Sequence, residues 1–163
     1  MPLIIRVHER LNKAFNPKTV KIGGDVWMAE NLAIDDGGDG ICFSKETNMY
    51  YYDWNAAKRI ADSLPGWHLP SIAEWGIACS NYKIKPIAYI GDEDNAQKLY
   101  ARLKVKLAGY YFDDLYNVGS VASFWTDDDS SGNAHRVGFD TNATIEHSII
   151  SKRCKNTIRL IKD

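Results

Sequence analysis

The most acidic stretch of the chain is residues 127–129, three consecutive aspartates followed by two serines and Gly132. Adjacent carboxylates repel one another unless water or a cation neutralises their charge, and oxygen-rich loops of this kind suit Ca²⁺. The alternating ligands and the final glutamate of an EF-hand are missing, and a solvated turn rich in Asp and Ser explains the same residues. We therefore expect no cofactor, with calcium at this loop as the alternative.

The histidines are the next candidates for chemistry, and the chain contains His8, His68, His135 and His147. His68 lies between two prolines and beside a tryptophan, which predicts a buried imidazole that holds its loop through a backbone hydrogen bond; catalysis is the alternative. His135 and His147 lie in polar stretches near Asp140 and Glu146. No HxxH or HxxxH spacing supports a metal held by this pair, so we assign no metal ligands.

Signatures of catalysis are missing from the sequence. No GxSxG motif surrounds a serine nucleophile, and the glycine pairs form neither GxGxxG nor a P-loop. Cys42, Cys79 and Cys154 are too widely spaced for a disulfide framework or a CxxC metal site. We therefore expect that the protein is not an enzyme.

The composition argues against nucleic-acid-binding and membrane-spanning proteins. The 163 residues suit one domain, the formal net charge is −1, and the pI of about 6.4 argues against nucleic-acid binding. No apolar run approaches the ~20 residues needed to cross a bilayer. The first residues also lack the apolar core of a signal peptide. We expect a protein that folds in the cytoplasm, with neither a membrane nor a nucleic acid as its partner.

The spacing of apolar residues predicts the helices that position these groups. Positions three or four apart predict helices over residues 3–15, 53–64, 71–80 and 94–104. Asp53 is the expected N-cap of the second helix, and the S-x-x-E capping box from Ser71 begins the third. Residues 1–17 form an N-terminal arm, helix or strand, that could mediate oligomerisation.

The strands are predicted by short runs of β-formers between turn residues. A tight hairpin is expected over residues 19–28 around Gly23 and Gly24. The later runs cover residues 107–112, 121–126, 134–139, 144–150 and 157–161. Helices first and strands later, without βαβ alternation, predict an α+β domain built on an antiparallel sheet.

Several motifs occur in a fixed order over residues 18–163. The most specific is G-W-H-L-P-S-x-x-E-W at residues 66–75, preceded by VKIGGDVWMAENL at residues 20–32 and followed by FWT at residues 124–126. Together they resemble the Fibrobacter succinogenes major paralogous domain, a family of bacterial secreted and surface modules. The resemblance implies a C-type-lectin-like fold, with two main helices packed on short antiparallel sheets and long loops presenting a ligand surface.

Two departures from this family pattern bear on function. Leu160 replaces the family's last cysteine, so Cys42 loses the disulfide partner that the resemblance implies. This fits folding in a reducing compartment, as for a phage structural protein. Residues 127–156 have no family pattern and mix Asn, Ser, Asp, His, Thr and Ile. They resemble the variable region of proteins diversified by retroelements, which gives a candidate variable region at residues 125–156; an ordinary polar sheet is the alternative.

These observations predict a non-enzymatic module that binds a ligand or receptor through its C-terminal region, displayed on a phage tail or bacterial surface. The expected partner is a protein or glycan on a cell surface, and a homo-oligomer is compatible with this role. Trp125 is the expected anchor. The predicted ligand-binding residues are Trp125, Asp127, Asp128, His135, Arg136, Asp140, Asn142, Glu146, His147 and Ser148.

Two other functions remain as alternatives. The first is a structural or adhesive surface module without a diversified site, in which residues 3–15 pair with a neighbouring chain. The second is an enzyme of the formylglycine-generating type. That chemistry needs a reactive cysteine pair or metal-binding thiols, and the spacing of Cys42, Cys79 and Cys154 gives no such pattern.

Overall fold

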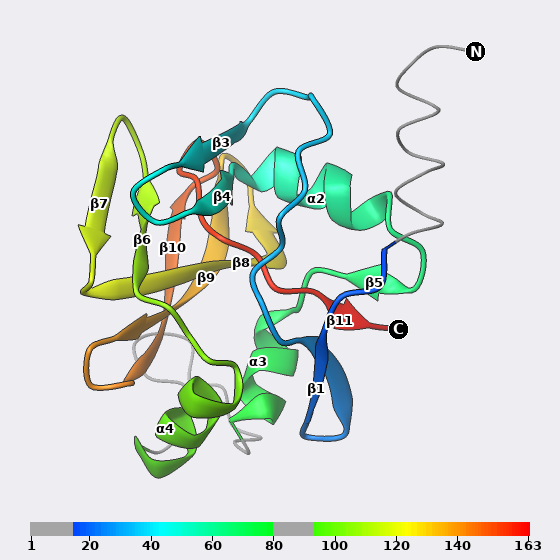
Figure 1. Cartoon of the computed structure of the whole chain (residues 1–163), viewed down its shortest axis with the longest axis vertical. Coiled ribbons are helices and arrows are strands. Elements are labelled where there is room, and N and C mark those ends of the chain that lie inside the picture. Colours follow the sequence, from blue (N-terminus) through cyan, green and yellow to red (C-terminus); the bar gives the residue numbers. More distant parts are fainter. Residues whose placement is uncertain (1–14, 80–92) are drawn as a thin grey trace.

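The computed structural model describes residues 15–79 and 93–163. Within them three helices accompany three β-sheets, which confirms the predicted α+β class (Figure 1). None of these helices is both long enough and apolar enough to span a membrane. The helix expected over residues 3–15 lies outside the described residues except for Phe15, whose ring packs edge-to-face on Trp67 at 5.7 Å.

Local capping signals position the helices, which are α2 (Trp54–Asp62), α3 (Ile72–Ala78) and α4 (Glu93–Arg102). Asp53 caps α2, since its carboxylate accepts a hydrogen bond from the Ala56 N–H at 2.8 Å. Ser71 and Glu74 form the predicted capping box of α3. Helix α4 ends before the predicted residue 104 because Lys104 has a φ of 48°, which helical backbone does not adopt.

A four-stranded sheet joins the two ends of the described chain. In spatial order its strands are β1 (Thr19–Ile22), β2 (Asp25–Met28), β11 (Ile161–Lys162) and β5 (Trp67–His68). The predicted hairpin is β1–β2, and its turn contains Gly23 and Gly24 at φ of 62° and 98°. Two consecutive positive φ angles suit a type I′ turn, which glycine adopts without strain. Ile161 pairs with both β2 and β5, so the regular part of the last strand is shorter than the predicted 157–161.

A five-stranded sheet carries most of the predicted site. In spatial order its strands are β10 (Ile145–Ser151), β9 (Asn133–Asp140), β8 (Val121–Ser130), β6 (Ala108–Tyr111) and β7 (Leu115–Val118). All neighbours are antiparallel except β6 and β8, which run parallel where Gly109 meets Ala122. The strands β7, β3 (Ile41–Ser44) and β4 (Met49–Tyr52) were not predicted; β3 and β4 form a separate hairpin.

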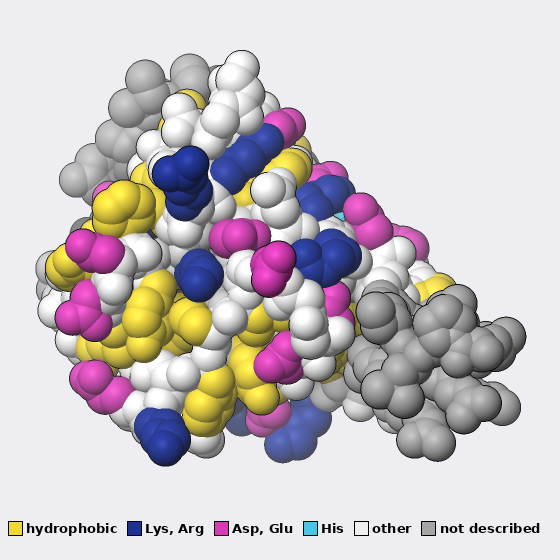
Figure 2. Space-filling model, turned by 90° about the horizontal axis from the view of Figure 1, so that it is seen from above, with side chains coloured by type: hydrophobic (Ala, Val, Ile, Leu, Met, Phe, Trp, Pro, Cys, Tyr) yellow, Lys and Arg dark blue, Asp and Glu magenta, His cyan; other side chains and the backbone are white. Residues whose placement is uncertain are grey.

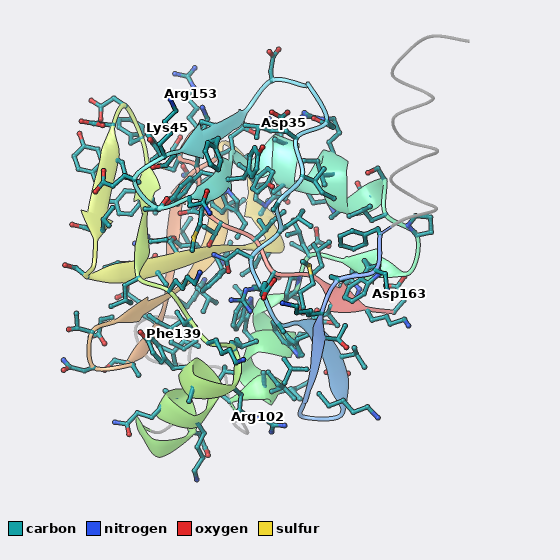
Figure 3. All side chains as sticks on the ribbon, in the orientation of Figure 1. Asp35, Lys45, Arg102, Phe139, Arg153 and Asp163 are labelled. Carbon is teal, nitrogen blue, oxygen red and sulfur yellow. The ribbon has the colours of Figure 1, made fainter. Side chains whose placement is uncertain are left out.

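The five-stranded sheet has a hydrophobic cluster on each face. On the side of α3 and α4, the Trp75 ring lies 4.7 Å from Trp27 and 5.5 Å from Phe124 between ring centroids. Phe139, labelled in Figure 3, belongs to the same cluster. On the side of α2, Trp125 packs with residues of β4, α2 and the segment before β11. Three of the five tryptophans therefore lie fully buried in the core.

Charges of opposite sign alternate on the face seen in Figure 2, where Lys and Arg lie among Asp and Glu and hydrophobic side chains. This agrees with the near balance of 20 basic and 21 acidic residues. Recognition on that face would depend on local groups because no broad field of one sign covers it.

Candidate ligand-binding surface

The predicted ligand-binding residues do not all lie on one surface. On β9 and β10, Arg136 is paired directly with Ser148. Because successive side chains of a strand point to opposite faces, Arg136, Ser148 and Glu146 share one face of the sheet. His135 and His147 lie on the opposite face. The structure thus separates two groups that the sequence had placed together.

Asp140 and Asn142 lie at the turn between β9 and β10. The Asp140 carboxylate accepts hydrogen bonds from the backbone N–H groups of Asn142 and Thr144, at 2.8 and 2.9 Å. Such bonds are the usual function of an aspartate that shapes a turn. Asp140 therefore orders the β9–β10 connection, and the Asn142 side chain is exposed at its tip.

The prediction of Trp125 as a ligand anchor is wrong. Its side chain is 0% exposed, and its indole N–H donates to the Tyr52 carbonyl at 2.7 Å. Trp125 is paired with Arg136 across β8 and β9, but the Trp125 indole packs inward against α2 and β4. A ligand on the surface cannot reach this ring without opening the core.

The turn predicted over residues 127–132 is confined to Ser131 and Gly132, because β8 continues through the three aspartates to Ser130. Each carboxylate has its own partner: Lys58 Nζ at 2.5 Å from Asp127, the Ile72 N–H at 2.7 Å from Asp128, and Lys152 Nζ at 2.5 Å from Asp129. The aspartates tie β8 to α2, to the start of α3 and to the residues after β10. In the described ranges no three His, Cys, Asp or Glu residues form a metal-binding group.

His135 and His147 form a close pair. Nδ1 of His135 lies 2.7 Å from Nε2 of His147, and the rings stack at a centroid distance of 4.9 Å. Burial lowers the pKa of His147, and the nearby His135 lowers it further, while Asp128 acts weakly in the other direction. A neutral pair shares one proton between these nitrogens. No spacing pattern in the sequence predicts this contact, because it depends on the register of β9 and β10.

His68 is held by carboxylates and not by the backbone hydrogen bond that we predicted. Its Nδ1 lies 2.7 Å from Oδ1 of Asp163, and its Nε2 lies 2.7 Å from Oε1 of Glu74. Burial alone would lower the pKa of His68, but the two carboxylates outweigh it and raise the pKa. Asp163, labelled in Figure 3, follows β11. His68 thus fastens β5, α3 and the last residue of the chain together.

A pocket opens on the Arg136 face of the sheet, with a volume of about 320 Å³. Its lining residues, which define the Arg136 pocket, are Tyr110, Phe112, Tyr116, Arg136, Ile150 and Cys154. Nε of Arg136 donates to Ser148 Oγ at 2.8 Å, and Nη1 donates to Ser123 Oγ at 3.0 Å. The guanidinium carbon lies 5.2 Å from the centroid of the Tyr110 ring. The cation is therefore held in one orientation at the pocket wall.

The opposite wall of the Arg136 pocket comes from the β6–β7 hairpin. Phe112 is 60% exposed and Tyr116 is 40% exposed, so both rings present apolar surface at the pocket. The Tyr116 hydroxyl donates to Asp113 at 2.6 Å, which fixes the ring at the rim. Gly109 permits the close approach of the two strands, since a Cβ there would lie 2.0 Å from the Tyr116 carbonyl oxygen. Exposed aromatic groups beside an ordered cation can hold a ligand by stacking and hydrogen bonding.

Comparison with known protein families, curated proteins and solved structures finds no match for this chain. The family resemblance and the C-type-lectin-like fold therefore stay predictions. The site must be argued from its own geometry.

Five of the six pocket residues were not predicted as site residues. Ile150 and Cys154 lie within the candidate variable region. Tyr110, Phe112 and Tyr116 precede that region, and the strand β7 that carries Tyr116 was not predicted. A usable signal was present: two short runs with tyrosines flank Asp113 and Asp114, as in a hairpin. Of the ten predicted site residues, Arg136 alone lines this pocket, with Ser148 and Glu146 beside it.

Proposed function

We propose that the protein is a non-enzymatic module with a C-type-lectin-like fold that binds a glycan or protein on a cell surface through the Arg136 pocket. The observation that carries this proposal is the pairing of exposed aromatic rings with a fixed guanidinium around one concavity. Phe112 and Tyr116 expose apolar area on the same pocket, where a ligand could bury it. Helices α2 and α3, which pack on largely antiparallel sheets, match the two main helices expected for that fold and support the finer assignment; α4 is a third helix.

The chemistry of the pocket suits recognition. The bonds of the Arg136 guanidinium to Ser123 and Ser148 reduce the rotamer entropy lost on binding. Burial raises the pKa of the Cys154 thiol, so this side chain contributes a neutral surface beside Ile150. A ligand that offers a hydrogen-bond acceptor to Arg136 and a flat apolar face to Phe112 would match both walls.

The two walls of the Arg136 pocket differ in their relation to the candidate variable region. Arg136, Ile150 and Cys154 lie within residues 125–156, whereas the aromatic residues come from the β6–β7 hairpin. A constant aromatic wall facing a diversified wall would keep general affinity while changing specificity. This division supports a role as the variable protein of a retroelement, displayed on a phage tail or bacterial surface.

The binding function is tested by presenting the whole chain to glycan and cell-surface protein arrays beside an Arg136→Met variant. The variant keeps the length of the side-chain stem and removes the donors. We expect hits for the native chain that weaken at least about tenfold in the variant, as for a central interface arginine. Equal melting temperatures within a few degrees serve as the folding control, and hits of equal strength in both proteins contradict the proposal.

The retroelement assignment has an independent test in the genome. We expect a reverse-transcriptase gene near the coding sequence and a near-identical repeat of the segment that encodes residues 125–156. A neighbourhood without either feature contradicts diversification and leaves the binding function to the array experiment.

A further inference from the structure

A second pocket, of about 300 Å³, lies apart from the Arg136 pocket and shares no residue with it. Its walls come from the segment after β2, the start of β4, the segment after α4, and Arg159 before β11. We call it the Arg159 pocket. The lining residues that matter for binding are Glu30, Asn31, Asn48, Lys104, Lys106 and Arg159.

Arg159 is an almost fully buried cation with neutral partners. Arg159 is only 2% exposed to solvent. Its Nε donates to Asn31 Oδ1 at 2.6 Å, and its Nη1 donates to the Met28 carbonyl at 3.1 Å. Within residues 15–79 and 93–163 no carboxylate lies at ion-pair distance from its guanidinium. Burial lowers the pKa of Arg159 to about 10, and the attraction of Glu30 opposes this only in part. A buried charge without an opposite charge is costly, so a negative group supplied from outside would be stabilised here.

The rim of the Arg159 pocket adds further positive charge. Lys104 and Lys106 are exposed and lie in the segment between α4 and β6. The positive φ of Lys104 fixes a sharp turn in this segment. The one carboxylate in the lining, Glu30, is already paired with Lys18 Nζ at 3.1 Å. Three cations thus line a concavity with a single carboxylate, which is hydrogen-bonded to Lys18 and only partly offsets the charge of Arg159.

We propose that the Arg159 pocket binds a compact organic anion, with a carboxylate or phosphate group held between Arg159 and the two rim lysines. The volume lies at the lower end of ligand pockets, which limits the occupant to a small molecule such as an acidic or phosphorylated monosaccharide. Leu32 and Met49 supply apolar surface for its body, while Asn31 and Asn48 offer amide groups for orientation. The site is independent of the binding function proposed for the Arg136 pocket.

The experiment is a calorimetric titration of the whole chain with three probes, namely inorganic phosphate, glucose 6-phosphate and glucuronate. We expect saturable one-to-one binding of at least one probe, with a Kd of about 1 mM or tighter and weaker binding at higher salt. Binding of glucose 6-phosphate alone assigns a phosphate ligand, and binding of glucuronate alone assigns a carboxylate. Absence of saturable binding by all three probes overturns the proposal.

Two double variants locate the binding. Lys104→Asn with Lys106→Gln removes the rim charges, and Asn suits the positive φ at position 104. Lys98→Gln with Lys162→Gln makes the same charge change on exposed residues outside the pocket. We expect at least about a tenfold loss of affinity in the rim variant and less than about twofold in the control. An equal loss in both variants would show a diffuse charge effect and overturn the site.

Discussion

On one face of β9 and β10, Arg136 donates to two serine hydroxyls and borders an open pocket. On the other face, His147 stacks on His135, and its Nδ1 is buried without a hydrogen-bond partner in the described chain. Arg136 and His135 are neighbours on β9, and His147 contacts His135 from β10, so adjacent residues of one polar stretch lie on opposite faces of the sheet. Strand alternation therefore decides which polar residues border the open pocket and which lie against the core.

The largest effect in this comparison is expected at Trp125, which lies on the Arg136 face but inside the core. Trp125→Ala removes a fully buried indole, and its hydrogen bond to Tyr52, and should lower the free energy of unfolding by about 3–5 kcal/mol. The control Ile149→Ala, at an exposed residue of β10, should change it by about 0.5 kcal/mol or less. Urea unfolding measures both free energies. A loss for Trp125→Ala as small as that for Ile149→Ala would contradict the structural role of Trp125 and favour the original prediction that it contacts a ligand.

A smaller effect is expected at Asp128, which accepts the Ile72 N–H at the start of α3. Asp128→Ala leaves this donor at the helix N-terminus without its acceptor, at a cost of about 1 kcal/mol in unfolding free energy. Asn142→Ala changes another of the predicted ligand residues, one exposed at a turn, and should cost less than about 0.5 kcal/mol. Equal values for the two variants in chemical denaturation would contradict the structural role of Asp128.

The smallest effect is expected in the pH dependence of the unfolding free energy, to which His147 and His68 contribute with opposite signs. The folded pKa of His147 is below its ordinary value of 6.5, so the unfolded state binds more protons and acidification destabilises the fold. The folded pKa of His68 is above 6.5, so its stabilisation is complete below that value and is lost as the pH rises through the folded pKa.

Unfolding free energies of His147→Gln and His68→Gln between about pH 5 and 8 separate the two contributions. Relative to the native chain, the first variant should lose less stability on acidification. The second should lose less stability as the solution becomes more alkaline. Slope changes of the same sign in both variants would contradict the assigned environments.

The parts of the fold that the sequence predicted are those set by local signals. The β1–β2 hairpin follows from Gly23 and Gly24, and the starts of α2 and α3 follow from Asp53 and Ser71. Each of these signals acts within about four residues of its own position. For the same reason the predicted positions agree closely with the structure.

The parts that sequence reasoning missed depend on distant partners. The aspartates at 127–129 lie in a strand because Lys58, Ile72 and Lys152 neutralise or bind them. The Arg136 pocket depends on the pairing of β6 with β7 and β8, which brings Tyr110 beside Arg136. Composition indicated a polar recognition surface, whereas the pocket combines a single cation with aromatic rings.

The central claim, that ligands bind at the Arg136 pocket, is tested most directly by the affinity of an array-identified ligand for two serine variants of exposed phenylalanines. Phe112 borders the pocket at 60% exposure, while Phe43 on β3 is 45% exposed and lines neither pocket. We predict that Phe112→Ser weakens binding at least about tenfold and that Phe43→Ser leaves it unchanged. Unchanged affinity in Phe112→Ser, or an equal loss in both variants, would contradict the account.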